Sequence, residues 1–398
     1  MRITFVSNYI NHHQLPFCRA MSSIGGDIEF FFIQTMPMEE KRVSMGWSVD
    51  MTAMDFLVLY YEEEERAKDL ILNSDVVMFG WTEGIAQDLR EERFNSGRLS
   101  FCVSERIYRE GQWKSISPRG RANKIREHVR FKDKPVYLLC VGAYVASDFE
   151  IIGAYPGRKL KWGYFPEAYD VGCAKERPSA VKRVKLCWAG RMITLKHPEF
   201  AIRLAKKLRD CGFDFRLDMV GDGELRQELE SEVKNNSLDE FVTFTGSLSP
   251  REVSSHMAAA DIFLFTSNYL EGWGAVVNEA MQSGCCVVAS GEAGCVPFLI
   301  NDMENGLIYR DGRYKDFENK VLFLFANQEK IAEFGSCARK TIGGLWNAKN
   351  AAGEFVRFCR QWLKGDKPSE ALEGPVSRAE VIKAPGFLRS MQEKNRLE

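Results

Sequence analysis

Short runs of β-forming residues alternate with segments of helical spacing along most of this sequence. The runs in the first half are 3–6, 28–33, 76–79, 99–103 and 136–141, and those in the second half are 184–188, 215–220, 242–244, 262–265 and 286–289. Amphipathic segments such as 198–209 separate them. Strands that are spaced by helix-length segments predict parallel sheets with crossover helices, a doubly wound α/β architecture.

The alternation pauses at residues 166–182, where prolines, a glycine and several charges interrupt the apolar periodicity. A chain of 398 residues holds two to three domains at about 150 residues each. We predict a Rossmann-like domain over 1–165, a linker over 166–182 and a second Rossmann-like domain over 183–345. A C-terminal helix and tail, 346–398, are expected to pack back toward the first domain. Because such sheets bind ligands at the carboxyl ends of their strands, a cleft between two sets of strand ends is the expected site.

The composition excludes several classes of protein. Hydrophobic residues make up 45% and charged residues 27% of the chain, as in an ordinary globular protein. A net charge of −1 excludes a general attraction to nucleic acid. The longest apolar run, 136–146, is too short to cross a bilayer, and residues 1–7 lack the features of a secretion signal. The eleven cysteines form no C-x-x-C and indicate reduced thiols, so we expect a cytoplasmic protein.

Two cations follow the first strand of the second series. Arg191 comes after the turn Ala189-Gly190, and Lys196 lies just before a predicted helix start at His197. Cations beside a helix N-terminus, at the carboxyl end of a parallel strand, are typical of an anion site, with phosphate the obvious ligand. A solvated basic loop is the alternative interpretation.

Two carboxylates lie in segment 268–284, which follows the strand 262–265. The spacing predicts Glu271 in a loop or helix cap, a helix from about Trp273, and Glu279 about two turns into that helix. Glycines on both sides of Trp273 would let backbone N–H groups approach a ligand closely. A plain helix cap for Glu271 and a surface position for Glu279 are the alternatives. However, apolar neighbours surround Glu279 in the sequence, and a buried carboxylate without partners is costly.

Glu271 and Glu279 also complete a pattern, E-G-x-G-x-x-x-x-E, that resembles the E-x7-E signature of family 4 glycosyltransferases. That family has the GT-B fold, in which two Rossmann-like domains face each other across a cleft. The resemblance extends in register over 185–310. It identifies the second domain as the nucleotide-sugar donor-binding one and implies that the first, 1–165, is the acceptor-binding one. The further matching elements are Gly190-Arg191…Lys196, Val220-Gly221-Asp222-Gly223, Phe244-Thr245-Gly246, Ala259–Asp261 and Glu304-Asn305-Gly306.

The resemblance implies a role for each matching residue. Arg191 and Lys196 would hold the diphosphate of a sugar nucleotide, and Glu279 would accept the ribose hydroxyls. Glu271 would face the donor sugar near its reacting carbon as a catalytic residue. The backbone groups and turns that complete the implied donor site belong to Gly190, Gly221, Gly246, Gly272, Trp273 and Gly274.

The resemblance also implies retention of anomeric configuration and no requirement for a metal. The chain has no D-x-D motif, and Asp222-Gly-Glu224 is closer to the family's turn than to a metal site. We therefore expect no metal and no cofactor besides the nucleotide-sugar substrate. In such a site, cations and oriented amides have to neutralise the charge that grows on the leaving diphosphate.

The N-terminal half departs from the family pattern. The loop after the first strand, Ser7–Gln14, has no glycine pair; it carries His12 and His13 instead, which we expect to contact the donor phosphate or the acceptor. Capping or packing is the alternative for both histidines. Where many members have a histidine, this chain has Ser104-Glu105-Arg106, which makes Glu105 the candidate acceptor-side catalytic group. A salt bridge from Glu105 to Arg106 or Arg109 is the alternative.

Segment 105–134 concentrates positive charge, with ten Lys or Arg against four Asp or Glu, a net of +6. Tyr108 and Trp113 interleave with these charges. The pattern predicts contact with an anionic membrane surface or a lipid-pyrophosphate acceptor, although a charge run is often only a solvated face. The protein would then be peripheral on the inner face of the membrane.

These observations together predict a retaining glycosyltransferase that uses a nucleotide-sugar donor and a saccharide or lipid-linked acceptor. The expected setting is the synthesis of a bacterial surface polysaccharide or glycolipid, by association with similar sequences. Two other hypotheses remain open: a sugar-nucleotide epimerase or phosphorylase on the same fold, and a non-enzymatic nucleotide-sugar-binding protein.

Overall fold

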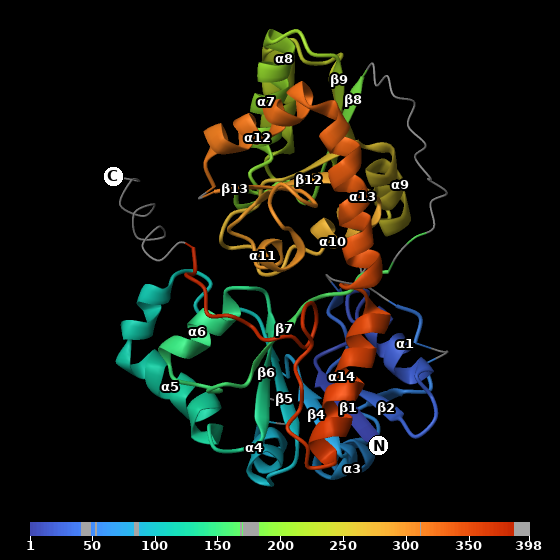
Figure 1. Cartoon of the computed structure of the whole chain (residues 1–398), viewed down its shortest axis with the longest axis vertical. Helices are drawn as coiled ribbons and strands as arrows, with labels where there is room; N and C mark the ends of the chain where they lie inside the picture. The colour runs from blue at the N-terminus through green and yellow to red at the C-terminus, as the bar shows by residue number, and fades with distance from the viewer. Residues whose placement is uncertain are drawn as a thin grey trace. The chain divides into compact units, whose positions relative to one another are not determined.

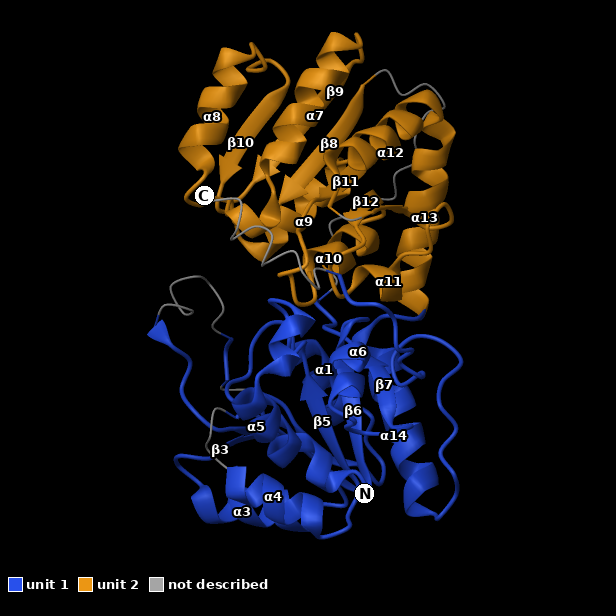
Figure 2. Cartoon of the chain, turned by 90° about the vertical axis from the view of Figure 1, so that its left-hand side faces the viewer, with its two compact units in different colours: residues 1–167, 345–398 blue, residues 168–344 orange. Residues whose placement is uncertain are grey.

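The computed structural model describes residues 1–40, 49–51, 54–82, 87–167, 169, 183–310 and 312–385. The chain divides into two compact units, residues 1–167 with 345–398 and residues 168–344 (Figure 2). We call them unit 1 and unit 2. The predicted boundaries at 165 and 183 stay a prediction, because most of the proposed linker, 168 and 170–182, lies outside the described residues.

Unit 1 is built on a parallel sheet. Its seven described strands lie in the order β3-β2-β1-β4-β5-β6-β7. Most of its strands have a core of buried apolar residues, as parallel sheets require when helices cover both faces. The strands are β1 (Arg2–Ser7), β2 (Glu29–Gln34), β3 (Leu57–Leu59), β4 (Val76–Phe79), β5 (Ser100–Ser104), β6 (Val136–Val141) and β7 (Lys159–Trp162).

Helices cover the sheet of unit 1, and the last of them, α14, comes from the C-terminal part of the chain (Figure 1). Helix α14 packs beside α1 on the sheet. Its Phe355 ring lies 4.8 Å from the Phe101 ring and 6.4 Å from the Phe17 ring, measured between centroids. The helices are α1 (Leu15–Ser23), α3 (Glu64–Asn73), α4 (Gln87–Asn95), α5 (Pro118–His128), α6 (Val145–Ile151) and α14 (Ala348–Leu363).

Unit 2 repeats the architecture, with its described strands in the order β10-β9-β8-β11-β12-β13, all parallel. Its helices are α7 (Glu199–Asp210), α8 (Arg226–Asn235), α9 (Pro250–Ala259), α10 (Val276–Gln282), α11 (Val296–Leu299), α12 (Tyr314–Ala326) and α13 (Gln328–Gly344). Its strands are β8 (Val184–Ala189), β9 (Phe215–Val220), β10 (Val242–Gly246), β11 (Ile262–Phe265), β12 (Cys286–Ser290) and β13 (Leu307–Tyr309).

Helix α7 shows why the sequence folds in this way. Phe200, Leu204 and Leu208 recur every four residues and are all buried in the core of unit 2. Burying one such side chain contributes roughly 1.5–3 kcal/mol, so the apolar stripe holds the helix on the sheet. The doubly wound α/β fold predicted from the sequence is confirmed.

One predicted boundary is wrong. The helix expected from about Trp273 begins at Val276, so Glu279 lies in its first turn rather than two turns inside it. Gly274, at φ +94°, occupies a conformation that interrupts a helix and delays its start.

No helix within the described residues combines the length and the apolar character needed to cross a membrane.

Candidate active site

An ion pair in unit 2 joins two residues from neighbouring loops. Lys196 ends a short 3-10 turn, Thr194–Lys196, in the connection after β8, and its Nζ bonds to Oε2 of Glu271, in the loop after β11. Both side chains are mostly buried. Because β8 and β11 are adjacent in the sheet, their following loops meet at its carboxyl edge. The structure thus brings together two residues that lie 75 positions apart in the sequence.

Further hydrogen bonds hold the two loops in register. The Thr266 hydroxyl donates to the Lys196 carbonyl at 2.5 Å and accepts from the Trp188 indole at 2.8 Å. The Asn268 amide donates to the Leu195 carbonyl at 2.9 Å. These bonds fix the position of the Lys196 backbone independently of its side chain. Sequence reasoning missed Thr266, although it directly follows a buried strand.

The predicted glycines lie at the ends of three neighbouring strands. The Gly190 amide donates to the Val220 carbonyl at 3.0 Å, and the Gly221 amide donates to the Gly246 carbonyl at 2.9 Å. Gly221 has φ +122°, and a Cβ atom there would lie 2.0 Å from the Gly190 carbonyl oxygen. Only glycine fits this approach, so the V-G-x-G turn has a structural reason beside any role in binding.

Arg191 is exposed and forms no ion pair with any described residue. It follows β8 and precedes Met192, whose amide donates to the Asp222 carbonyl at 2.8 Å. The guanidinium group is therefore available to an incoming anion, while the backbone on either side is held. Its proposed contact with a diphosphate stays a prediction.

Glu279 is the most unusual carboxylate of the site. Its side chain has no hydrogen-bonding or ionic partner among the described residues and is partly buried. Loss of solvent around it raises the pKa of Glu279 to about 7. A fully solvated surface position, one alternative raised by the sequence, does not agree with this shift. The position suits a carboxylate that receives hydroxyl groups from a ligand.

The segment between Glu271 and Glu279 would present backbone groups, rather than side chains, to a ligand. Trp273 is buried, and its indole donates to Asn278 at 2.9 Å. A Cβ atom on Gly274 would lie 2.7 Å from the Phe265 ring, so glycine is required there. Glu271 does not cap α10, because the N-cap position is Ala275. The alternative of a plain helix cap for Glu271 is therefore wrong.

Two residues after β12 border this region and were not singled out from the sequence. The Cys295 amide donates to the Trp273 carbonyl at 3.1 Å, and Glu292 is buried in the same connection. The signal was an acidic residue between glycines, Gly291-Glu292-Ala293-Gly294, directly after a predicted strand.

The predicted N-terminal histidines lie in unit 1, before α1. Their ring centroids are 3.9 Å apart, and the His13 ring stacks on Tyr164 at 5.3 Å. Burial lowers the pKa of His12 and, with a contribution from His12, lowers that of His13 to about 3. Both imidazoles are therefore neutral near pH 7 and offer no charge to a phosphate. Neither caps α1, whose N-cap is Gln14.

Glu105 makes one of the two salt bridges considered from the sequence. Its Oε2 lies 3.8 Å from Arg109, whereas Arg106 pairs instead with the buried Asp148 at 3.1 Å. Its other oxygen, Oε1, accepts a hydrogen bond from the Tyr164 hydroxyl at 2.8 Å. Glu105 is thus held beside the aromatic side chains of unit 1, and its acceptor-side role stays a prediction.

The basic segment 105–134 presents fewer free charges than its composition suggests. Tyr108 is 6% exposed, so the expected contribution of this ring to a membrane surface is wrong. Arg130 pairs with Glu91, Lys124 with Glu127 and Lys114 with Glu110. The cations that are exposed and form no ion pair within the described part of the chain are Arg119, Arg121, Arg126 and Lys132.

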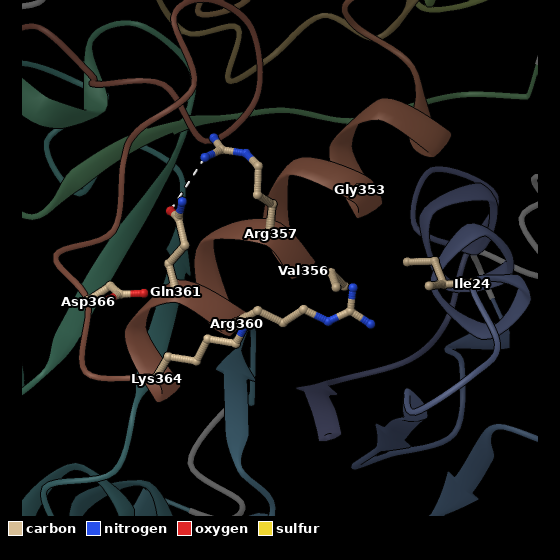
Figure 3. Close-up of a pocket in the computed structure, with 8 residues that line it drawn as sticks. All are labelled: Ile24, Gly353, Val356, Arg357, Arg360, Gln361, Lys364 and Asp366. Carbon is tan, nitrogen blue, oxygen red and sulfur yellow. Dashed lines mark hydrogen bonds between the residues drawn. The ribbon is translucent and has the colours of Figure 1, made fainter.

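A groove on unit 1 lies between the end of α1 and α14 (Figure 3). Two of its three cations already have partners: Arg360 pairs with Asp27, and Arg357 pairs with Glu354 and also bonds to Gln361. Paired charges on an open surface contribute little to binding. We therefore place the candidate site at the strand ends of unit 2 and not in this groove.

Comparisons with known proteins bear on the fold and on one segment of the sequence. Residues 174–341 match the family described as glycosyl transferases group 1. HepE from Anabaena, solved in complex with UDP, aligns with a TM-score of 0.65 at 15% identity, covering 92% of this chain and all of HepE. S. aureus TarM aligns with a TM-score of 0.52 at 17% identity, covering 77% of this chain and 57% of TarM. The fold is GT-B.

Each of two curated relatives matches about half of this chain. The 2-deoxystreptamine glucosyltransferase of Streptomyces kanamyceticus is 33% identical over 200 residues, which is 47% of this chain and 51% of the relative. A GDP-mannose-dependent phosphatidylinositol monomannoside mannosyltransferase of Mycobacterium tuberculosis is 26% identical over 192 residues, 46% of this chain and 48% of the relative. The chain thus matches about half the length of these curated relatives.

Proposed function

We propose that the protein is a retaining glycosyltransferase that moves a sugar from a nucleoside-diphosphate sugar to a hydroxyl group of an acceptor. The Lys196–Glu271 ion pair, together with Glu279, which has no partner among the described residues, carries this proposal. It lies in the segment that matches glycosyl transferases group 1. The glycosyltransferase names of the relatives, and the UDP complex of HepE, support a nucleotide-sugar donor.

The proposed reaction exchanges one bond at the anomeric carbon for another. The bond from this carbon to the diphosphate oxygen breaks, and the nucleoside diphosphate leaves with the electron pair. The acceptor hydroxyl oxygen forms the new bond on the same face, and its proton passes to the departing diphosphate. Negative charge grows on the leaving group, so a cation already positioned beside it lowers the barrier.

Each residue has a separate task in this proposal. Lys196 and Arg191 neutralise the diphosphate, the first from a mostly buried position and the second from the surface. Glu279 accepts the ribose hydroxyls, whose hydrogen bonds favour its charged form. Glu271 orients Lys196 and faces the sugar, whose positive character increases in the transition state.

For the acceptor we propose a saccharide or a lipid-linked saccharide. One relative, from Erwinia amylovora, is described as an amylovoran biosynthesis glycosyltransferase, and the mycobacterial relative is named for a phosphatidylinositol mannoside. These names support a role in bacterial surface polysaccharide or glycolipid synthesis. Contact of the exposed arginines of α5 with an anionic membrane is part of the same proposal.

The test is a thermal-shift screen of the full chain against UDP-, GDP- and ADP-sugars, followed by product analysis with the sugar that binds. A ligand that binds only the native state raises the melting temperature. A transferase hydrolyses its donor slowly without acceptor and releases a sugar of unchanged anomeric configuration. Interconversion of donor isomers would indicate an epimerase, and binding without turnover a non-enzymatic protein; either result would contradict the proposal.

A further inference from the structure

His197, directly after Lys196, has a backbone conformation that residues with a side chain usually avoid. Its φ is +46° and its ψ is +52°, in the left-handed region. The next residue is Pro198, and a residue before a proline is normally pushed toward extended backbone. Such a conformation persists only where surrounding contacts determine it, and it is found most often at functional sites. The His197 side chain makes contacts that can hold it.

Both ring nitrogens of His197 have a partner. Nδ1 lies 2.7 Å from Oε1 of Glu199, in the first turn of α7. Nε2 lies 3.3 Å from Nδ2 of Asn268, in the loop after β11. The ring also packs on the buried Phe200, with 5.1 Å between the ring centroids. We call Glu199, His197 and Asn268 the relay, because they connect a helix fixed on the core of unit 2 to the loop that carries Glu271.

Asn268 shapes the turn in which Glu271 lies. Its side-chain oxygen accepts a hydrogen bond from the Leu270 amide at 3.0 Å, and its backbone carbonyl accepts one from the Glu271 amide at 3.0 Å. Asn268 is 8% exposed, so water competes little for these bonds. A contact that holds the Asn268 side chain therefore also holds the turn that presents Glu271.

The hydrogen bonds of Asn268 determine where the proton lies on the His197 ring. Because Oδ1 of Asn268 accepts from Leu270, its amide nitrogen faces His197 and donates. Nε2 of His197 then has to accept, and the ring proton lies on Nδ1, which donates to the Glu199 carboxylate. A proton on Nε2 would place two donors against each other. The relay therefore requires one tautomer of the neutral imidazole.

Lys196 depends less on the relay than Glu271 does. The Lys196 carbonyl accepts from the Thr266 hydroxyl, which itself accepts from the buried indole of Trp188. These bonds remain when the His197 ring is removed. Loss of the ring should therefore loosen the Glu271 turn more than it displaces the lysine.

We propose that His197 is a positioning residue, which through Asn268 sets the turn that presents Glu271 to the donor sugar. The inference rests on the proposed glycosyltransferase function, in which Glu271 faces the reacting carbon. It explains why a histidine is present where a glycine would adopt the left-handed backbone more easily. Only a side chain of this length joins the first turn of α7 to the loop after β11.

The test is a double-mutant cycle of His197→Gly and Glu271→Gln, with donor turnover measured on the full chain. His197→Gly keeps the left-handed backbone and removes the ring, so it should fold. Alone it should lower kcat at least about tenfold and change donor affinity less than about threefold. In the Glu271→Gln background it should lower kcat less than about twofold, because residues that act as a unit are not additive. Calorimetry gives the affinity and the fraction of molecules that bind donor, which separates slow turnover from partial unfolding.

Two further substitutions test whether the ring acts through its hydrogen bonds. His197→Gln carries an oxygen that can accept from Asn268 and should restore most of kcat. His197→Asn tolerates the left-handed backbone but is too short, so it should behave as His197→Gly does and replaces that variant if it fails to fold. His256→Gln is the matched control. His256 lies on α9 of unit 2, outside these loops, and pairs with Asp218 at 2.8 Å, so donor turnover should not change.

The proton position can be measured independently of turnover. The chain has five histidines, so NMR of the protein with isotope-labelled histidine can assign His197 by the signal that His197→Gln removes. At mildly alkaline pH we expect the tautomer with its proton on Nδ1. The tautomer with its proton on Nε2 would overturn the relay.

Failure of this inference and failure of the proposed function give different results. If the wild type turns over a nucleotide sugar, unchanged kcat in His197→Gly would overturn the inference alone. An equal loss of kcat in the wild-type and Glu271→Gln backgrounds would do the same. If the wild type turns over no nucleotide sugar, the proposed function is contradicted, and the tautomer of His197 then supports or overturns the relay.

Discussion

Lys196 and Glu271 form an ion pair across two loops that follow the adjacent strands β8 and β11. In the proposed reaction the donor diphosphate also contacts the Lys196 ammonium group. Glu271 and the diphosphate then become alternative partners of one cation. The pair keeps Lys196 positioned before the donor arrives, which reduces the reorganisation needed at the transition state.

Glu271→Gln and Glu279→Gln should differ in kinetic effect. Glu271→Gln removes a charge that faces the reacting sugar, so kcat should fall at least about tenfold, or 1.4 kcal/mol. Glu279→Gln weakens ribose contacts that persist through the reaction, so it should chiefly raise the donor KM. Steady-state kinetics at saturating acceptor separates the two effects. Identical changes in both variants would contradict the separate roles.

Glu279 should also make stability depend on pH. Its pKa is about 7 in the folded protein, against 4.5 for the ordinary group, so folding disfavours its ionised form. Below pH 4.5 both states hold the proton and no penalty applies. As pH rises toward 7 the unfolded chain ionises first, and the penalty grows to at most about 3 kcal/mol. Without donor, Glu279→Gln should therefore raise the melting temperature above pH 7 and leave it unchanged below pH 4.5. A gain that is constant across this range would refute the assignment.

Donor turnover should continue in excess EDTA. The proposed site neutralises the diphosphate with Lys196, Arg191 and backbone amides, so no divalent cation is required for the bond to break. The measurement compares the rate of donor hydrolysis before and after dialysis against the chelator. Complete loss of turnover that Mg²⁺ or Mn²⁺ restores would reject this mechanism.

Binding to membranes is expected to depend on the exposed arginines of α5. Each cation near an anionic surface contributes about 1 kcal/mol, and salt screens it over roughly 10 Å at 0.1 M. Replacing Arg119, Arg121 and Arg126 by Glu should abolish sedimentation with phosphatidylserine vesicles and leave donor hydrolysis intact. Replacing Lys206 and Lys234, two exposed lysines of unit 2, by Glu is the control and should leave sedimentation unchanged. If the wild type ignores anionic vesicles at low salt, the basic segment is a solvated face.

The strands could be predicted because most of them are continuous apolar runs. β4, β6, β9 and β11 begin and end where the sequence placed them. The missed strands are short or mixed: β7, Lys159–Trp162, alternates lysine with apolar residues, and β3 and β13 have three residues each. Such short segments carry too little periodicity to be distinguished from loops.

The candidate site was predictable as a set of residues but not as contacts. Spacing pointed to Glu271, Glu279 and Lys196 separately. The pairing of Lys196 with Glu271 depends on the adjacency of β8 and β11, and strand order cannot be read from local sequence. The same holds for His13, Trp81 and Tyr164, which come from three distant segments and meet because β1, β4 and β7 end at one edge of the sheet.

The most direct test of the central claim measures donor affinity in Lys196→Ala and Arg191→Ala by calorimetry, with the nucleotide sugar that stabilises the wild type. Each substitution removes a charge-assisted contact of about 1.5–3 kcal/mol, so affinity should fall about ten- to a hundredfold. Lys206→Ala, an exposed lysine on α7, is the control and should bind normally. The account predicts folded variants with weak donor binding. Wild-type affinity in both variants would contradict the assignment of the diphosphate site.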